Sequence, residues 1–209
     1  MPHSWPALII AVVVSVYWGR VLQMVRRARK AAGHDANFVP REKLGRLLRY
    51  IWMPVVGLWV VLPYIEAFLS PKHRMFLMRP VFRDNVIPWL AAGLGAVALV
   101  ATFVCWTKMG TSWRMGINPG DKTKLISTGP FAYIRHPIYA LSSLLMIFTM
   151  IVVPSPLMMT AGGLHLLLLQ WEARREEKYL LRVHGDEYRA YTDRTGRFMP
   201  RLFHRPLTV

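Results

Sequence analysis

The sequence predicts an all-α integral membrane protein, built as a bundle of about five transmembrane helices. Apolar residues make up 54% of the 209 residues and charged residues only 18%, whereas soluble domains contain about 25% charged residues. The apolar residues gather in five long runs. The formal net charge of +16 comes from the segments around those runs. We therefore assign the basic charge to a membrane face and exclude a nucleic-acid site.

The five runs differ in length, which shapes the expected bundle. The first three approach the ~20 residues that cross the hydrocarbon of a bilayer. The last two are shorter, and the turn signal Pro154-Ser155-Pro156 between them cannot continue a helix. We expect a helical hairpin there, with helices that extend into polar sequence. Helices keep their backbone hydrogen bonds internal in lipid, so the bundle is expected to be wholly helical. The predicted spans are Trp5–Leu22, Ile51–Leu69, Val86–Trp106, Ile138–Val153 and Leu157–Trp171.

The distribution of Lys and Arg predicts the orientation. No cationic stretch precedes the first run, so we expect a retained helix and not a cleaved signal peptide. The segments 20–49, 108–135 and 174–205 hold 23 of the 27 Lys and Arg residues, and segment 72–83 holds four. The positive-inside rule then places the N-terminus outside and the C-terminus in the cytoplasm. We divide the chain into a two-helix region with a basic cytoplasmic loop, residues 1–85, and a core of residues 86–209.

Polar sequence before the last hairpin carries the first candidate site. Pro137 favours the first turn of a helix and forces the preceding His136 out of the helical region. The fourth span is therefore expected to begin at Pro137. Its free backbone N–H groups and positive dipole end suit a carboxylate or another polar ligand group. Tyr139 lies in the same first turn.

The polar sequence after the hairpin contains the second candidate site. The stretch Glu172–Val183 is amphipathic, with Glu172 and Glu176 on one face by the 3.6-residue period. Two like charges four residues apart destabilise a helix unless a cation lies nearby, so we expect a cationic partner, and Arg175 is an internal candidate. Two simpler interpretations stay open: interfacial anchoring by the Arg135-His136 pair, and a solvated helix face. Histidines with metal-ligand spacing are absent from the predicted helices, and we expect no metal.

Together these residues resemble the isoprenylcysteine carboxyl methyltransferase and phospholipid methyltransferase superfamily of integral membrane enzymes. The resemblance covers about Gly110 to Pro200. Its centre is the run GPFAYIRHPIY at Gly129–Tyr139. The second element is the pair Glu176-Glu177, followed by GDEY at Gly185–Tyr188. The ordered pair of motifs, separated by a helical hairpin, is more specific than either one.

The resemblance implies an enzyme that transfers a methyl group from S-adenosyl-L-methionine to a lipophilic substrate dissolved in the membrane. The carboxylate of an isoprenylcysteine-like compound is one candidate acceptor. The resemblance also implies a cytoplasmic cofactor pocket between the loop before the fourth helix and the C-terminal extension of the fifth, which makes residues 86–209 the methyltransferase core. The implied cofactor contacts are Lys124, Leu125, Ile126, Phe131, His136, Pro137, Ile138, Tyr139 and Glu176. His136 and Glu176 must then lie close enough to share one small molecule.

The sulfonium of this cofactor is already activated, so an ionised carboxylate acceptor needs no general base, and we expect no obligatory catalytic residue. The protein is expected to accelerate the reaction by aligning the two reactants and by excluding water. One position departs from the family: Glu172 stands where isoprenylcysteine enzymes have a substrate-binding arginine. An anionic acceptor would be repelled there unless Arg135, Arg174 or Arg175 compensates, so these three are candidate positioning residues. A lipid-soluble amine or another amphipathic acceptor stays open.

Two other functions fit parts of the pattern. Some sterol reductases carry a related Arg-His-Pro-x-Tyr stretch. An NADPH-dependent membrane reductase of that type would bind nucleotide phosphates through Lys122, Lys124 and Arg135. A non-enzymatic membrane protein would instead use its basic loops to bind anionic lipid. The paired glutamates favour the methyltransferase.

Overall fold

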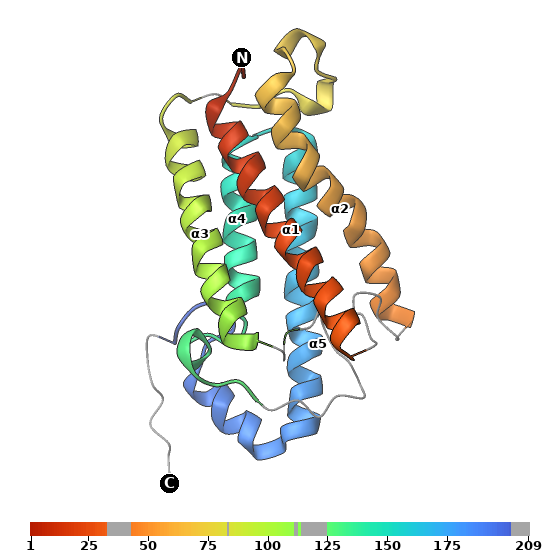
Figure 1. Ribbon diagram of the computed structural model, residues 1–209, viewed down its shortest axis with the longest axis vertical. Coiled ribbons are helices and arrows are strands. Elements are labelled where there is room, and N and C mark those ends of the chain that lie inside the picture. Colours follow the sequence, from red (N-terminus) through yellow and green to blue (C-terminus); the bar gives the residue numbers. More distant parts are fainter. Residues whose placement is uncertain (33–42, 83, 111–112, 114–124, 202–209) are drawn as a thin grey trace.

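The computed structural model describes residues 1–32, 43–82, 84–110, 113 and 125–201. Within these residues the chain folds into α-helices that lie side by side in one elongated bundle (Figure 1). Short 3-10 turns occur at η1 (Pro71–His73), η2 (Phe76–Met78) and η4 (Gly129–Ala132). The five described α-helices are α1 (Trp5–Ala32), α2 (Lys43–Phe68), α3 (Ile87–Met109), α4 (Pro137–Val152) and α5 (Pro156–Arg194).

Three helices of the described chain are candidate membrane spans by length and composition. The stretch Trp5–Lys30 of α1, together with α2 and α3, is long and apolar enough to cross a membrane. Helix α4 is apolar but has 16 residues, which span about 24 Å at ~1.5 Å per residue. Helix α5 is long, but much of its length is polar. The prediction of five helices is therefore confirmed, whereas the prediction of five spans holds for three by length and composition.

The helix ends follow local signals, and the helices run further than the apolar runs. Helix α1 continues ten residues beyond the predicted end at Leu22, because the Arg- and Lys-rich sequence that follows is also helix-forming. Helix α4 ends at Val152 and α5 begins at Pro156, so the predicted hairpin is confirmed. The Ser155 hydroxyl caps α5 by accepting a hydrogen bond of 3.3 Å from the Met158 backbone N–H.

One hydrophobic core joins the N-terminal pair of helices to the rest of the chain. Ile10 of α1, Trp59 of α2 and Leu145 of α4 are fully buried in it. A Cβ on Gly95 of α3 would press against Ile10, so this glycine allows a close approach of α1 and α3. Residues 1–85 and 86–209, which the sequence divides, thus share a single core. The outer face of α3 exposes large apolar side chains, as a lipid-facing helix does: Leu90, Leu94, Val97, Val100 and Val104.

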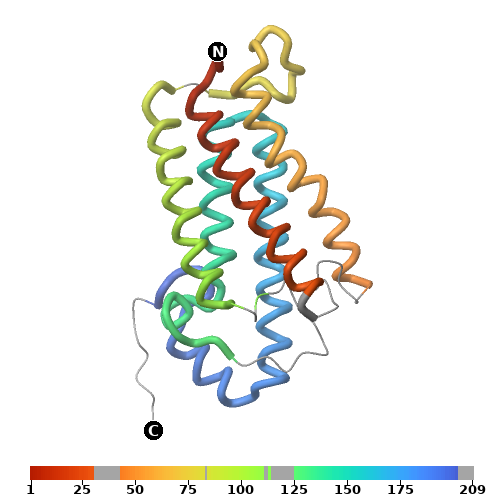
Figure 2. The backbone as a smooth tube through the Cα atoms, in the orientation of Figure 1, coloured from red at the N-terminus to blue at the C-terminus, as the bar shows by residue number. Residues whose placement is uncertain are grey.

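Helix α5 passes the end of α4 and then turns back. The turn is at Gly185, whose backbone (φ 53°, ψ −123°) is one that side-chain-bearing residues rarely adopt. Figure 2 shows the chain reversing there, so that the last part of α5 runs back toward the bundle. This reversal brings residues 195–201 beside the segment that precedes α4, where Ile134 and Gly196 form a parallel β-bridge.

Candidate functional site

The C-terminal segment and the segment before α4 are joined by backbone hydrogen bonds. The Arg135 N–H donates to the Gly196 carbonyl (2.8 Å), and the His136 N–H donates to the Arg197 carbonyl (3.1 Å). The Gly196 N–H donates to the Tyr133 carbonyl (3.2 Å). A Cβ at Gly196 would overlap a backbone carbonyl of the following turn, so glycine alone fits there. These contacts hold the C-terminal segment against the segment before α4 at one end of the bundle.

Glu177 lies at the centre of a charged cluster at this end and is neutralised by two arginines. Arg135 donates through Nε to Glu177 Oε1 (2.9 Å) and also bonds the carbonyls of Thr192 and Thr195. Arg197 forms a fork on the same carboxylate, with distances of 3.0 and 2.5 Å. Burial raises the pKa of Glu177, but the His136 imidazole and the two arginines outweigh burial and hold the pKa well below its usual range. Glu177 is therefore an ionised structural anchor.

Glu176, the neighbouring carboxylate, faces a different set of groups. The Tyr139 hydroxyl donates to Glu176 Oε2 (3.1 Å), and His136 Nδ1 lies 3.7 Å from the same oxygen. The rings of His136 and Tyr139 are parallel, with centroids 5.3 Å apart. His136 Nε2 is buried and has no hydrogen-bond partner among the described residues, although Glu177 Oε1 lies 3.4 Å away. The proximity of His136 and Glu176 that the sequence hypothesis requires is therefore present.

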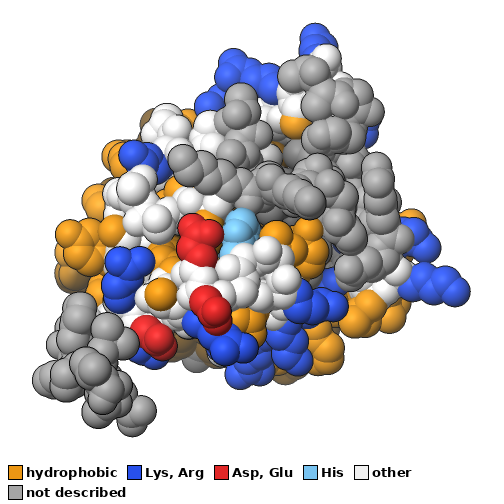
Figure 3. All heavy atoms as spheres, turned by 90° about the horizontal axis from the view of Figure 1, so that it is seen from below, with side chains coloured by type: hydrophobic (Ala, Val, Ile, Leu, Met, Phe, Trp, Pro, Cys, Tyr) orange, Lys and Arg blue, Asp and Glu red, His pale blue; other side chains and the backbone are white. Residues whose placement is uncertain are grey.

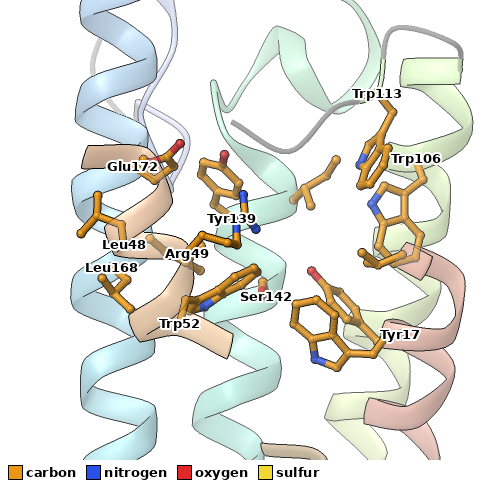
Figure 4. A pocket seen from close by; sticks show the side chains of 15 residues that line it. Tyr17, Leu48, Arg49, Trp52, Trp106, Trp113, Tyr139, Ser142, Leu168 and Glu172 are labelled. Carbon is orange, nitrogen blue, oxygen red and sulfur yellow. The ribbon is translucent and has the colours of Figure 1, made fainter. Parts of the chain in front are cut away.

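An aromatic cavity of about 100 Å³ adjoins this cluster on the bundle side of Tyr139 (Figure 4). Helices α1 to α5 all contribute to its walls. Its charged side chains are Arg49 of α2 and Glu172 of α5, and the Arg49 Cζ lies 4.9 Å from the centroid of the Trp52 ring. The aromatic side chains that line it are Tyr17, Trp18, Trp52, Trp106, Trp113 and Tyr139.

A hydrogen-bonded chain behind the cavity wall fixes the position of Trp52. The Trp52 indole N–H donates to His165 Nδ1 (3.0 Å), and His165 Nε2 lies 3.2 Å from the Ser142 hydroxyl. Since an indole nitrogen can only donate, Nδ1 accepts, and the neutral imidazole carries its proton on Nε2. His165 is fully buried and serves as a packing residue with both nitrogens satisfied.

The structure brings some of the predicted site residues together and leaves others apart. Pro137 begins α4 with His136 at its N-cap (φ −124°, ψ 63°), as predicted. Phe131 is buried in η4, where its carbonyl accepts from the Tyr191 hydroxyl (2.6 Å). Leu125 and Ile126 are half-buried in the segment before η4. Lys124, like Lys122, lies outside the described residues. A cofactor pocket between the loop before α4 and the extension of α5 stays a prediction, because the cavity lies on the other side of Tyr139.

The three candidate positioning arginines have distinct surroundings. Arg175 donates to Glu172 Oε2 (2.6 Å), so it is the internal cation expected from the paired glutamates. Arg174 is exposed. Arg135 forms an ion pair with Glu177. The reductase hypothesis assigned the Arg135 guanidinium to nucleotide phosphates, but Glu177 already binds it.

Three residues of the site were missed from the sequence. Arg197 is a second cation on Glu177, and the Phe198 ring packs edge-on to His136 at 6.2 Å. Arg49 enters the aromatic cavity from α2. No local pattern marks Arg197 or Phe198, because their partners lie 20 or more positions away in the chain. Figure 3 looks onto this end of the molecule, where acidic side chains and a histidine lie next to each other and basic side chains lie further out. Among the described residues, no group of three or more His, Cys, Asp or Glu side chains could hold a metal ion.

The helical bundle, its membrane-span candidates and the polar cluster at one end define a multi-pass membrane protein. Residues 91–182 match the model of the isoprenylcysteine carboxyl methyltransferase (ICMT) family. The match confirms the resemblance seen in the motifs. It contains His136, Tyr139, Glu176 and Glu177, and it leaves out Arg49.

One curated protein is similar over a longer stretch. It is the nickel-cobalt-cadmium resistance protein NccN of Alcaligenes xylosoxydans xylosoxydans, 28% identical over 150 residues that cover 66% of this chain and 69% of that protein. No solved structure matches the chain.

Proposed function

We propose that this protein transfers a methyl group from S-adenosyl-L-methionine to a lipophilic acceptor dissolved in the membrane. The match of residues 91–182 to the ICMT family model supports the cofactor and the reaction class. The observation that carries the proposal is the position of Tyr139. Its hydroxyl bonds Glu176 in the polar cluster, and its side chain lines the aromatic cavity. A polar ligand at Glu176 and an apolar ligand in the cavity would therefore meet at one residue.

The groups around Glu176 fit such a cofactor. Glu177 is saturated by two arginines, whereas Glu176 accepts one hydrogen bond among the described residues, from Tyr139. Its carboxylate therefore has lone pairs left for an ammonium or hydroxyl group. The buried His136 Nε2 also lacks a partner in the described chain. At the start of α4, free backbone N–H groups suit a ligand carboxylate. His136, Tyr139 and Glu176 would thus hold the polar parts of the cofactor, which supplies a methyl group on an activated, cationic sulfonium.

The role of the chain in this reaction is alignment. The Arg135–Glu177–Arg197 cluster holds the C-terminal segment against the loop before α4, and the bonds from Tyr139 and Arg175 orient Glu176 and Glu172. Fixing the reactants in this way removes translational and rotational freedom from the rate-limiting step and can lower the barrier by several kcal/mol. We place the cluster at the cytoplasmic face with the N-terminus outside, on the basis of the excess of Lys and Arg in the three segments on that side.

The proposal is tested by cofactor binding. Purified protein in detergent is titrated with S-adenosyl-L-methionine in a calorimeter, beside Glu176→Gln and the matched control Glu187→Gln, whose side chain is 70% exposed on the same helix. We expect the wild type and the control to bind alike and Glu176→Gln to bind roughly tenfold more weakly, because a charge-assisted hydrogen bond is lost. Absence of binding by the wild type, or equal binding by all three proteins, overturns the proposal. Thermal stabilisation by NADPH and not by S-adenosyl-L-methionine supports the reductase instead.

A further inference from the structure

The loop between α2 and α3 exposes large apolar side chains at one end of the bundle. Its described residues are 69–82 and 84–86, and Figure 1 shows it at the end opposite the reversal of α5. A neighbouring group of exposed apolar side chains on a protein surface marks a site that contacts a membrane or another protein. The most exposed apolar side chains of the loop are Met75, Phe76, Leu77, Val81, Phe82 and Val86.

Buried contacts fix the conformation of this loop. Arg74 is 4% exposed, and its guanidinium donates to the carboxylate and to the backbone carbonyl of Glu66. Met78 packs against the core of the bundle. The Val81 N–H donates to the Pro154 carbonyl (2.8 Å), in the turn between α4 and α5. The loop is thus tied to both neighbouring parts of the bundle, and its apolar side chains point outward from a fixed backbone.

The loop also carries two exposed cations. Lys72 lies in η1, and Arg79 directly follows η2. The Arg79 Nε donates to the Arg74 carbonyl (3.4 Å), which places the Arg79 guanidinium beside the end of η1. Asp84 accepts from two backbone N–H groups at the start of α3 (2.7 and 2.6 Å). Neither Lys72 nor Arg79 has an acidic partner among the described residues, so the loop presents positive charge next to its apolar side chains.

The position of the loop relative to a bilayer follows from the two helices that it joins. Helix α2 ends at Phe68 and α3 begins at Ile87, and both are candidate spans, so the loop lies where the chain leaves the hydrocarbon. Irregular backbone exposed to lipid does not occur within the hydrocarbon, because its N–H and C=O groups would lack partners. Apolar side chains are in turn disfavoured in water. The boundary between headgroups and acyl chains satisfies both requirements, and cations at that depth meet lipid phosphates.

We propose that the α2–α3 loop is an interfacial anchor in the leaflet opposite the polar cluster. Phe76 and its apolar neighbours insert at the headgroup–acyl boundary, while Lys72 and Arg79 bind the phosphates of anionic lipids. The partner of this surface is therefore the lipid bilayer, and not a second copy of the chain. The proposal gives a role to basic residues on the side with few positive charges, since headgroups neutralise them there. It does not depend on the proposed methyl transfer.

The test measures the depth and the lipid neighbours of the loop in bilayer nanodiscs. Phe76→Cys is labelled with the polarity-sensitive fluorophore NBD in a Cys105→Ala background, and Met75→Cys repeats the measurement at the adjacent exposed position. Glu187→Cys is the reference for water and Val97→Cys, on the outer face of α3, is the reference for hydrocarbon. The nanodiscs contain phosphatidylcholine or phosphatidylglycerol that carries a nitroxide quencher, either near the headgroup or deep in the acyl chain.

We expect the shallow nitroxide to quench the label at position 76 more than the deep one, the reverse at position 97, and little quenching by either at position 187. Phosphatidylglycerol should be enriched over phosphatidylcholine around position 76. Lys72→Gln and Arg79→Gln should each lower this enrichment roughly fivefold. Lys43→Gln makes the same charge change at the other end of α2, where Lys43 is exposed, and should leave the enrichment unchanged.

Three results overturn the proposal. Quenching at position 76 as weak as at position 187, with emission typical of water, shows that the loop lies in solvent. Emission typical of an apolar environment without quenching by either lipid shows that protein covers the loop. Equal quenching by the two headgroups, or an enrichment that survives both Lys72→Gln and Arg79→Gln, removes the cations from lipid binding.

Discussion

Replacing Glu177 by glutamine tests whether the charged cluster holds the C-terminal segment in place. The substitution keeps the shape of the side chain but removes the charge that Arg135 and Arg197 share. Side-chain exposures are 14% for Glu177, 11% for Arg135 and 31% for Arg197. Breaking a fully buried ion pair costs about 3–5 kcal/mol, and an exposed pair contributes about 0–1 kcal/mol. Since Arg197 is partly screened by solvent, we expect a loss of roughly 2–3 kcal/mol.

The chain contains a convenient reporter for this measurement. Cys105 is its one cysteine and is 2% exposed, so a thiol-reactive fluorescent maleimide labels it when the bundle unfolds. The expected loss of free energy corresponds to a melting temperature lower by roughly 5–10 °C. Glu187→Gln is the control, because the Glu187 side chain is 70% exposed and His184 Nδ1 lies 3.9 Å from its carboxylate. We expect that variant to change stability by less than about 0.5 kcal/mol.

The pH dependence gives a second, independent check. The pKa of Glu177 is lower in the folded than in the unfolded chain, where it is about 4.3. Its contribution is therefore complete above about pH 5 and is lost as the pH falls toward the folded value. The difference in melting temperature between wild type and Glu177→Gln should be constant from about pH 6 to 8 and should shrink below about pH 4.3. Equal melting temperatures at neutral pH, or a difference that grows on acidification, would refute this reasoning.

Three further substitutions test local features by the same maleimide assay. Gly196→Ala should destabilise the C-terminal turn by at least about 2 kcal/mol, because its new Cβ overlaps a backbone carbonyl. Limited proteolysis should then cleave the C-terminal segment faster than in the wild type. An unchanged cleavage rate contradicts this prediction. Gly185→Ala should cost about 1–2 kcal/mol through its positive φ alone, since no atom lies near the new Cβ. The control Gly163→Ala, helical and with open space around it, should stabilise by up to about 1 kcal/mol; equal effects at the two glycines contradict the backbone argument. Thr149→Val should cost about 1 kcal/mol, because the buried Trp59 N–H loses its 3.0 Å acceptor; a melting temperature equal to that of the wild type shows that Trp59 finds another acceptor.

Much of the fold is local in origin and could therefore be predicted. The two prolines around Ser155 set the hairpin, and Pro137 sets the start of α4, because the ring of proline restricts its own backbone and that of the preceding residue. The spacing of Glu172 and Glu176 predicted a nearby cation, and Arg175 is that cation. The five apolar runs predicted five helices, which the described chain contains, and three of these helices are long and apolar enough to span a membrane, since α4 is short and α5 is polar over much of its length.

The sequence by itself determined an all-helical membrane bundle, its hairpin and the start of α4, because each depends on the order of residues within one short stretch, and its two motifs gave the resemblance that the match of residues 91–182 confirms. The tertiary structure alone decided which charges meet. Glu177 finds Arg197 because the chain reverses at Gly185, and Arg49 reaches the cavity beside Glu172 because α2 packs against α5. Partners so distant along the chain are set by the packing of whole helices, and no local pattern encodes that packing.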